Sequence, residues 1–463
     1  MPSSKLLAGL KSIKKISGNP SLEELIINTD SRSFKKGETF VALEGENFDG
    51  FNYVKSVLEL GASAVAFTDN SNREEEVKKL VAQYPGTQFI YTTSSLAFLQ
   101  ELASAHALAW KASNPERKII GITGSNGKTT HKEMVYYLLH SLFGEKVLAT
   151  KGNLNNHIGV PLTIFRLKDE HDIAIVEMGM NHPGEIAELC SVAHPEHGMI
   201  TNVGPAHIEF MKSIENIFLE KSSLYLSVLK NSKGAGSFVV NADDDYLRRL
   251  EKSSGLTTYG EKDGDVKVKI HGSEIAFIFN KKSMLINNKN ILEHHNLKNL
   301  AGTALLAMKL FPDRAEEIAQ AASRYEQPNM NRSQWVEQIF LDAYNANPSS
   351  MKVSLDSFIS VMKNREVDLN DCFFVLGDMN ELGEFARELH IEIAKHLMQA
   401  GVANVCFIGR YKEFYLEGFG PTAMSYLKKE DFYLEWKSIR KKYKYIFIKA
   451  SRSLQLETLM SIV

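Results

Sequence analysis

The sequence predicts an α/β fold of three domains: a smaller α/β N-terminal domain, a central domain on a doubly wound, mostly parallel sheet, and a C-terminal Rossmann-like domain. Three observations predict it. Short apolar runs alternate with longer helical stretches along most of the chain, as in βαβ units with helices on both faces of a sheet. A glycine-rich loop, Gly121–Thr130, joins one such run to a helical stretch. The length of 463 residues is too great for one ordinary core.

The N-terminal domain is expected to cover residues 1–114. Its apolar runs Thr39–Leu43, Ser63–Thr68 and Gln88–Thr92 are predicted strands, because turn residues separate them. Ser95–Ala112 has apolar residues at helical spacing and is predicted to be a helix. The stop-and-turn residues Ser113-Asn114-Pro115 follow it, so we place the domain boundary there.

The central domain (residues 115–327) and the C-terminal domain (residues 328–463) are expected to meet near Gln327-Pro328-Asn329. The predicted strands of the central domain are Ile119–Thr123, Asp172–Met178, Gly198–Asn202 and Ser237–Asn241. Those of the C-terminal domain are Ile339–Leu341, Cys372–Leu376, Asn404–Ile408 and Tyr445–Lys449. Ligands of such sheets bind at the carboxyl ends of strands, and active sites often lie between such domains.

Composition and charge narrow the function classes. Hydrophobic residues make up 44% and the formal net charge is −2, so nucleic acid is not the expected partner. No apolar run approaches the roughly 18 residues that span a bilayer, and Met1–Lys15 lacks the apolar region of a signal peptide. Cys190, Cys372 and Cys406 are far apart and odd in number, which favours buried thiols. We expect a cytoplasmic monomer without membrane insertion.

The glycine-rich loop predicts a phosphate site. Glycines let backbone N–H groups approach a ligand, and the helix N-terminus that follows favours anions. Lys128 supplies a charge for phosphate and Thr129 a hydroxyl for Mg²⁺. The usual first glycine of a P-loop is replaced by Ile122, and Gly121 lies one residue too early. An ordinary glycine turn is the alternative, but such turns seldom place Gly-Lys-Thr at the first turn of a helix.

Other side chains follow the predicted strands. Glu177 ends an apolar strand, where a magnesium ligand or a residue orienting water is favoured, although it could be a plain strand-end acid. His207 follows the next strand and by itself is more often structural. Lys221, in a helical stretch, would by itself be a solvated lysine.

Two polar loops offer amides and a carboxylate. Asn153–Pro161 contains three amides and a histidine, which suit a polar uncharged ligand or, equally, a turn rich in Asx motifs. Asp342–Pro348 follows a C-terminal strand, and Asp342 could accept two hydrogen bonds from ribose. Arg332 lies near the joint between domains and could reach a γ-phosphate on closure.

Together these segments closely resemble the Mur ligases, the ATP-dependent amide-bond ligases of peptidoglycan precursor synthesis. The resemblance spans nearly the whole chain, and the loop Gly121–Thr130 resembles the family's own version of the P-loop, which accounts for the displaced glycine. Further matching segments are Thr29–Arg32, Phe40–Leu43, Phe48–Gly50, Gly152–Pro161, Glu177–Glu185, His295–Asn299, Tyr344–Pro348 and Leu376–Gly383.

The last two of these segments are specific to the branch of the family that adds D-alanyl-D-alanine to a UDP-N-acetylmuramoyl-tripeptide. The Asp-Asn-Pro-Arg tetrapeptide of the ligases that add the preceding diamino acid is replaced by Asn345-Ala-Asn347-Pro348. The similar folylpolyglutamate synthases share the glycine loop but not these segments. Departures are Ile208–Lys212 after His207, Leu341 in place of an acid, and Lys449-Ala-Ser-Arg452 in place of Lys-Gly-Ser-Arg.

The resemblance implies a role for each candidate residue. Catalytic residues would be Lys128, His207, Lys221 and Arg332. The ATP-binding residues would be Gly124, Ser125, Asn126, Gly127, Lys128, Thr129, Thr130, Asn296, Asn299, Arg332 and Asp342. The UDP-substrate would contact Ser31, Arg32, Asn153, Asn155, Asn156 and His157, and the amine Tyr344, Asn345 and Asn347. Mg²⁺ would bind Thr129, Glu177, His207 and Lys221, the last carbamylated by CO₂.

The implied reaction is ATP-dependent ligation through an acyl phosphate. Two other classes of protein remain alternatives: a P-loop switch or kinase, which would not depend on an amine, and an inactive ligase homologue that only binds. Intact Lys128, Thr129, Glu177 and His207 argue against the second.

Overall fold

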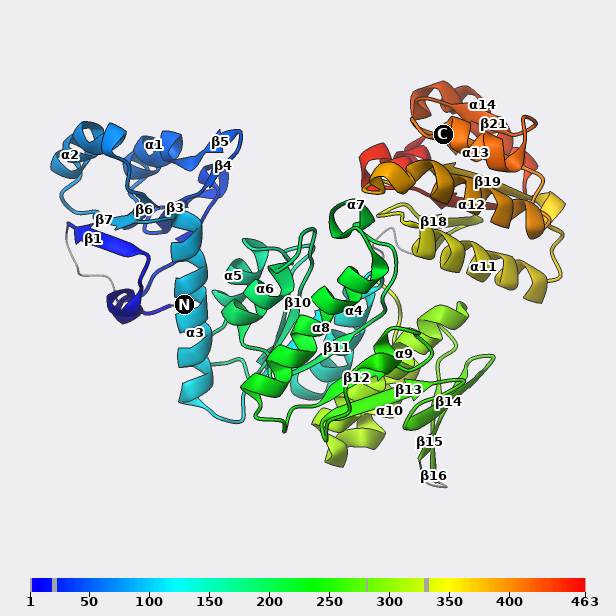
Figure 1. Cartoon of the computed structure of the whole chain (residues 1–463), viewed down its shortest axis with the longest axis horizontal. Coiled ribbons are helices and arrows are strands. Elements are labelled where there is room, and N and C mark those ends of the chain that lie inside the picture. Colours follow the sequence, from blue (N-terminus) through cyan, green and yellow to red (C-terminus); the bar gives the residue numbers. More distant parts are fainter. Residues whose placement is uncertain (1, 19–22, 280–281, 329–332, 463) are drawn as a thin grey trace.

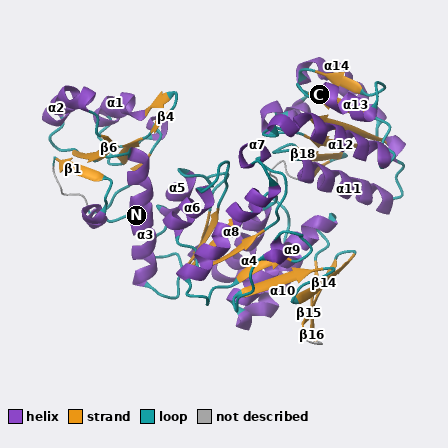
Figure 2. Cartoon of the chain, viewed as in Figure 1, coloured by secondary structure: helices purple, strands orange, loops and turns teal. Residues whose placement is uncertain are grey.

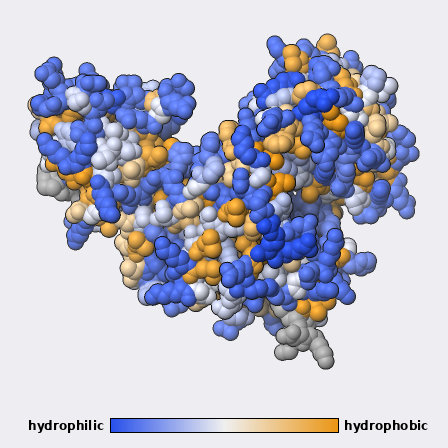
Figure 3. Space-filling view, in the orientation of Figure 1, coloured by the Kyte–Doolittle hydropathy of each residue, from blue (hydrophilic) through white to orange (hydrophobic). Residues whose placement is uncertain are grey.

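The computed structural model describes residues 2–18, 23–279, 282–328 and 333–462. Three α/β domains follow one another along the molecule, each with its own main sheet (Figure 1). The space-filling view shows a wide hollow between the N-terminal and C-terminal domains, above the middle domain (Figure 3). None of the helices in the described ranges is long and apolar enough to cross a membrane.

The N-terminal domain has a five-stranded sheet in the order β1-β7-β6-β3-β2, parallel except for β1. Its strands are β1 (Ile13–Ser17), β2 (Ile27–Asn28), β3 (Thr39–Ala42), β6 (Ala64–Thr68) and β7 (Gln88–Thr92), and β4 (Glu44–Gly45) pairs with β5 (Phe48–Asp49). Its helices are α1 (Val54–Glu59), α2 (Glu74–Gln83) and α3 (Ser95–Ser113). The three strands and the helix predicted from sequence are confirmed.

The middle domain is built on a nine-stranded sheet in the order β16-β15-β14-β13-β12-β11-β8-β10-β9, with helices on both sides (Figure 2). The sheet is parallel from β9 to β14. Its strands are β8 (Lys118–Thr123), β9 (Val147–Ala149), β10 (Ile173–Glu177), β11 (His197–Ile200), β12 (Phe238–Asn241), β13 (Leu256–Gly260), β14 (Val266–His271), β15 (Glu274–Phe279) and β16 (Lys282–Asn287). Its helices are α4 (Lys128–Phe143), α5 (Gly159–Ile164), α6 (Glu185–Ala193), α7 (Ile208–Met211), α8 (Ile214–Asn231), α9 (His294–Leu310) and α10 (Ala315–Arg324).

Five strands of this sheet are additional to the four predicted ones: β9, β13, β14, β15 and β16. β14, β15 and β16 form an antiparallel meander at one edge. Val266 and Val268 of β14 are buried while Lys267 and Lys269 are exposed, so this strand has one buried and one solvated face.

The C-terminal domain has a six-stranded sheet in the order β17-β18-β22-β19-β20-β21, parallel except for β17. Its strands are β17 (Gln334–Val336), β18 (Ile339–Asp342), β19 (Cys372–Gly377), β20 (Val405–Ile408), β21 (Met424–Tyr426) and β22 (Tyr445–Lys449). Its helices are α11 (Pro348–Asn364), α12 (Ala386–Gln399), α13 (Lys412–Phe419) and α14 (Lys429–Lys442). The predicted fold class is confirmed in all three domains.

Candidate active site

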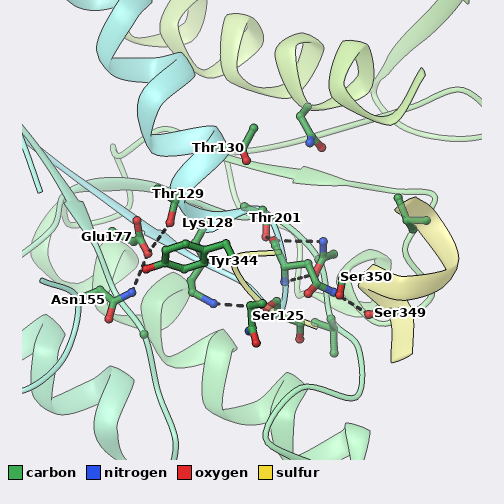
Figure 4. A pocket seen from close by; sticks show the side chains of 18 of the residues that line it. Ser125, Lys128, Thr129, Thr130, Asn155, Glu177, Thr201, Tyr344, Ser349 and Ser350 are labelled. Carbon is green, nitrogen blue, oxygen red and sulfur yellow. Dashed lines mark hydrogen bonds between the residues drawn. The ribbon is translucent and has the colours of Figure 1, made fainter. Parts of the chain in front are cut away.

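A cavity of about 730 Å³ lies where the middle and C-terminal domains meet, and Figure 4 shows it at close range. Most of the residues predicted from sequence line it. These are Ser125, Asn126, Gly127, Lys128, Thr129, Thr130, Asn153, Asn155, Asn156, His157, Glu177, His207, Asn296, Asn299, Asp342, Tyr344 and Asn345. The structure thus brings the glycine loop, the amide-rich loop and the polar loop after β18 to one place.

The glycine loop connects the carboxyl end of β8 to the N-terminus of α4. Gly124 and Gly127 adopt positive φ angles of 156° and 74°, conformations that side chains disfavour. A Cβ on Gly124 would lie 1.8 Å from Oγ1 of Thr201, so any side chain there would force its surroundings to shift. The loop therefore presents backbone N–H groups and the positive end of the helix dipole to the cavity.

Gly121 has a different task from the loop glycines. It lies within β8, and a Cβ on it would come 2.6 Å from Cδ1 of Leu224 on α8. Its lack of a side chain lets α8 pack closely against the sheet. The first glycine of the segment is thus a packing residue, and Gly124 and Gly127 shape the phosphate loop.

Lys128 folds back over the loop. Its Nζ donates to the carbonyl oxygens of Gly124 at 2.7 Å and of Ser125 at 3.4 Å. The ammonium group therefore stands at the rim of the loop, beside the backbone that would surround a phosphate.

Glu177 ends β10 as a nearly buried carboxylate with 1% exposure. Its Oε1 accepts hydrogen bonds from Oγ1 of Thr129 at 3.2 Å and from Nδ2 of Asn155 at 2.7 Å (Figure 4). Its Oε2 is buried and has no hydrogen-bond partner in the described part of the chain. An unpartnered buried carboxylate oxygen next to a threonine hydroxyl is a donor set that fits Mg²⁺.

His207 precedes α7 in a left-handed conformation, with φ of 58°. Its Nδ1 lies 2.6 Å from Oε2 of Glu381, which comes from the C-terminal domain. This contact, with help from the Lys128 charge, holds the pKa of Glu381 below its usual value. Glu381 was not singled out in the sequence, although it lies in the matching segment Leu376–Gly383.

Lys221 lies on α8 with 1% exposure, outside the residues that line the cavity. The carboxylate of the preceding Glu220 accepts hydrogen bonds from the N–H groups of Gly184 and Ile186, both at 2.7 Å, and forms no ion pair with Lys221. Within the described ranges, no hydrogen bond or ion pair is found for the Lys221 amine. Burial, together with the charge of nearby Lys128, holds its pKa well below the usual lysine value.

The start of α9 supplies the His-Asn-x-x-Asn segment. Burial lowers the pKa of His295 to about 4, and its Nδ1 lies 3.2 Å from Oγ of Ser357. Asn296 donates to Oε1 of Gln327 at 3.1 Å and accepts from Asn299 at 3.3 Å. The neutral ring and the two amides form a polar patch that could hydrogen-bond a nucleobase.

Asp342, at the end of β18, forms a buried ion pair that the sequence did not suggest. Nζ of Lys449 lies 2.6 Å from its Oδ2, and Oγ of Ser354 donates to the same oxygen at 2.8 Å. Burial alone would raise the pKa of Asp342, but the Lys449 ammonium outweighs it and the pKa lies below its usual value. Nζ of Lys449 also donates to the carbonyl oxygen of Asn345 at 3.0 Å, which fixes the following loop.

A few predicted residues lie apart from the cavity. Ser31 and Arg32 belong to the N-terminal domain and do not line it; Arg32 pairs with Asp30 at 2.7 Å. Asn347 lies behind the lining as the N-cap of α11. Arg332 lies outside the described residues.

Three family models match the chain. They are described as the Mur ligase family catalytic domain, over residues 25–107, the Mur ligase middle domain, over residues 122–307, and the Mur ligase glutamate ligase domain, over residues 331–422.

Curated relatives and solved structures agree with these models. The UDP-N-acetylmuramoyl-tripeptide–D-alanyl-D-alanine ligase of Bacillus subtilis is 30% identical over 97% of this chain and 95% of its own. The enzyme of that name from Escherichia coli is 30% identical over 83% of this chain and 81% of its own.

MurF from Acinetobacter baumannii superposes with a TM-score of 0.82 at 23% identity, covering 100% of this chain and 98% of its own. MurF ligase from Thermotoga maritima, solved in complex with ADP, gives a TM-score of 0.75 at 26% identity, covering 95% of this chain and 96% of its own. The chain therefore belongs to the Mur ligase family.

Proposed function

We propose that this chain is an ATP-dependent ligase that joins D-alanyl-D-alanine to UDP-N-acetylmuramoyl-tripeptide, giving the pentapeptide, ADP and phosphate for peptidoglycan synthesis. One observation carries the proposal: a single cavity is lined by the phosphate loop, the amide-rich loop and the Tyr344–Asn345 loop of the C-terminal domain. Three reactants could therefore meet there. The relatives that bear this enzyme name match nearly the whole length of the chain.

In the proposed reaction the tripeptide carboxylate attacks the γ-phosphorus of ATP, and ADP leaves. The resulting acyl phosphate is attacked by the dipeptide amine, and phosphate leaves as the amide forms. The loop N–H groups and Lys128 offset charge on the transferring phosphoryl group. Arg332 is proposed to reach the same group, and Asn296, Asn299 and Asp342 to hold the nucleoside.

Mg²⁺ is the expected cofactor. Thr129 and Glu177 fit it, because Oε2 of Glu177 is buried and accepts no hydrogen bond from the described residues. When bound, Mg²⁺ would screen the phosphate charges. In the described ranges no group of three or more His, Cys, Asp or Glu could hold a metal, which agrees with an ion that takes most of its ligands from phosphates and water.

A second metal position is proposed at His207 and carbamylated Lys221. In the described ranges the buried Lys221 amine has no hydrogen-bond or ion-pair partner, and its depressed pKa favours the neutral form, the form that adds to CO₂. The product is a carbamate anion and a proton. The carbamate would turn this buried amine into a carboxylate-like ligand.

The remaining proposals concern the substrate-binding residues, the domain boundaries, the oligomeric state and the cellular compartment. Ser31, Arg32, Asn153, Asn155, Asn156 and His157 are proposed to bind the UDP-substrate, and Tyr344, Asn345 and Asn347 the amine. We propose domain boundaries at residues 1–114, 115–327 and 328–463, and a monomer in the cytoplasm. The three cysteines are free and buried, in keeping with a reducing compartment.

The decisive experiment measures phosphate release from ATP and UDP-N-acetylmuramoyl-tripeptide, with and without D-alanyl-D-alanine. The proposal expects release that depends on the amine and a new amide product. Release or phosphorylation without the amine would favour a switch or kinase, and binding without turnover an inactive homologue. Lys128→Ala should abolish ligation and leave the fold intact; near-normal ligation by that variant would contradict the assignment.

A further inference from the structure

The phosphate loop is tied to the C-terminal domain through the side-chain amide of Asn126. Its Nδ2 donates to Oγ of Ser349 at 2.6 Å, and its Oδ1 accepts from Nδ2 of Asn347 at 2.6 Å. Both partners belong to the start of α11, more than two hundred residues further along the chain. Because the amide donates and accepts across the joint, it fixes both the separation and the relative rotation of the two elements.

Asn126 is equally well held on its own side. Its carbonyl oxygen accepts from Oγ1 of Thr201 at 2.5 Å, and its N–H donates to Oδ1 of Asn202 at 2.9 Å. A Cβ on Gly204 would lie 2.9 Å from Oγ of Ser349, so the domains approach closely here. The side-chain amide of Asn126 therefore connects the phosphate loop, which is itself held by Thr201 and Asn202, to the start of α11.

On the other side, Asn347 connects this amide to the proposed amine site. It is 5% exposed, and its Oδ1 caps α11 by accepting from the N–H of Ser350 at 2.9 Å. Just before it, the carbonyl of Asn345 is held by Lys449 at 3.0 Å. The Tyr344–Asn345 loop is thus fixed to β22 at one point and to the phosphate loop at the other.

We propose that Asn126, Asn347 and Ser349 form a latch that positions the amine-binding loop against the acyl phosphate. This inference rests on the proposed ligase function. It gives Asn347, which lies behind the cavity lining, a positioning role in the second step in place of direct contact with the amine. Asn126 and Ser349 have the same positioning role. Acyl phosphate formation uses groups of the phosphate loop and β10. Amide formation also needs the amine about 3–3.5 Å from the acyl carbon, and a displacement of about 1 Å can cost about 100-fold.

The test uses Asn347→Ser and Ser349→Ala. Serine keeps an N-cap oxygen at position 347 but lacks the side-chain amide that donates to Asn126, and alanine removes the acceptor at position 349. Ser360→Ala, an exposed serine of the same helix, is the matched control. Two activities are compared: incorporation of labelled ADP into ATP with the UDP-tripeptide but no amine, which reports the acyl phosphate, and complete amide formation.

Each latch variant is expected to lower kcat for amide formation about 10- to 100-fold and to raise KM for the dipeptide. The ADP exchange should stay within about twofold of the parent protein, and the control should match the parent in both. Equal loss of exchange and amide formation, or no loss of either, would overturn the latch. Absence of amine-dependent ligation in the parent protein would instead refute the proposed function on which it rests.

Discussion

At the scale of single residues, Lys128 and Lys221 show how burial changes the properties of an amine. Lys128 lines the cavity, whereas Lys221 is buried, has no hydrogen-bond or ion-pair partner in the described part of the chain, and has a depressed pKa. Lys221→Ala should lower the ligation rate about 10²- to 10³-fold, because the proposed carbamate, a preorganised charged group, would be lost. A short-chain carboxylate such as formate should restore part of it by filling the space.

A control variant and a spectroscopic measurement test whether the loss of activity comes from the carbamate. Lys230→Ala, at the last turn of the same helix, should leave the rate unchanged. Carbon-13 NMR with labelled bicarbonate should show a carbamate signal in the parent protein but not in Lys221→Ala. Full activity of Lys221→Ala would return this lysine to a structural role.

Four histidines with depressed pKa values predict how stability depends on pH. Burial lowers the pKa of His131, His197, His295 and His390 to about 4, from the ordinary 6.5. The unfolded chain therefore binds more protons between these values, so stability is full above about pH 6.5 and is lost as pH falls toward 4. Each unit of pKa difference is worth about 1.4 kcal/mol.

His390→Gln isolates one of these contributions. Nε2 of His390 accepts from the N–H of Met379 at 3.1 Å, and Nδ1 lies 2.6 Å from the carbonyl oxygen of Ala386, contacts that an amide can imitate. Urea midpoints followed by tryptophan fluorescence should fall between about pH 7 and pH 5 in the parent chain, and less steeply in the variant. Equal slopes for the two proteins would contradict this assignment.

Two kinds of residue were predicted from the sequence. They belong to a short local motif, or they stand at the end of a predicted strand. Lys128 and Thr129 follow from one loop, and Glu177 from the end of one strand. Glu381 and Lys449 were missed because each acts through a contact between distant segments: Lys449 meets Asp342 across 107 residues. Such pairs leave no local pattern.

At the scale of elements, the connection from β8 to α4 depends on Gly124. A Cβ at this position would overlap Oγ1 of Thr201 at 1.8 Å, and the φ of 156° is unfavourable for a side chain. Gly124→Ala should therefore distort the loop and weaken ATP binding at least about tenfold, with little change in the melting temperature of the other domains. Isothermal titration with ATP measures it.

Gly86→Ala is the matched control for this prediction, because nothing lies within 4 Å of a Cβ there and φ is not positive. The control should bind ATP like the parent protein. Unchanged ATP affinity in Gly124→Ala would mean that the loop can adjust without losing its function.

Several strands buried on both faces were predicted, but the buried strand β13 and the half-exposed meander β14–β16 were not. β8, β10 and β19 are continuous apolar runs, as expected for central parallel strands. β14 reads Val-Lys-Val-Lys-Ile-His, an alternation that was a usable signal for a strand with one buried and one solvated face. β15 pairs with β14, and β16 pairs with β15. No short sequence motif marks these pairings.

At the scale of the whole molecule, the two outer domains are attached to the middle one in different ways. Helix α3 ends the N-terminal domain and packs along the middle domain, where Trp110 donates to the carbonyl of Lys168 at 2.9 Å and Ser104 to that of Ser191 at 3.1 Å. The C-terminal domain meets the middle domain at α7, Glu381 and the Asn126 latch, around the cavity itself (Figure 1). Movement during catalysis is therefore expected between the middle and C-terminal domains.

A designed disulfide tests that movement. A Cβ on Gly204 would lie 3.5 Å from Cβ of Ser349, within the separation of about 3.5–4.5 Å that disulfides need. The native cysteines are buried and free, so they should not compete. Oxidised Gly204→Cys/Ser349→Cys should stop turning over, because a locked joint hinders exchange of substrates and products, and a reductant should restore the rate of the reduced double variant. The two single variants control for the lost serine hydroxyl and the added side chain, and mass spectrometry confirms the bond.

Equal steady-state rates with the disulfide formed and reduced would mean that the enzyme completes its cycle without opening this joint.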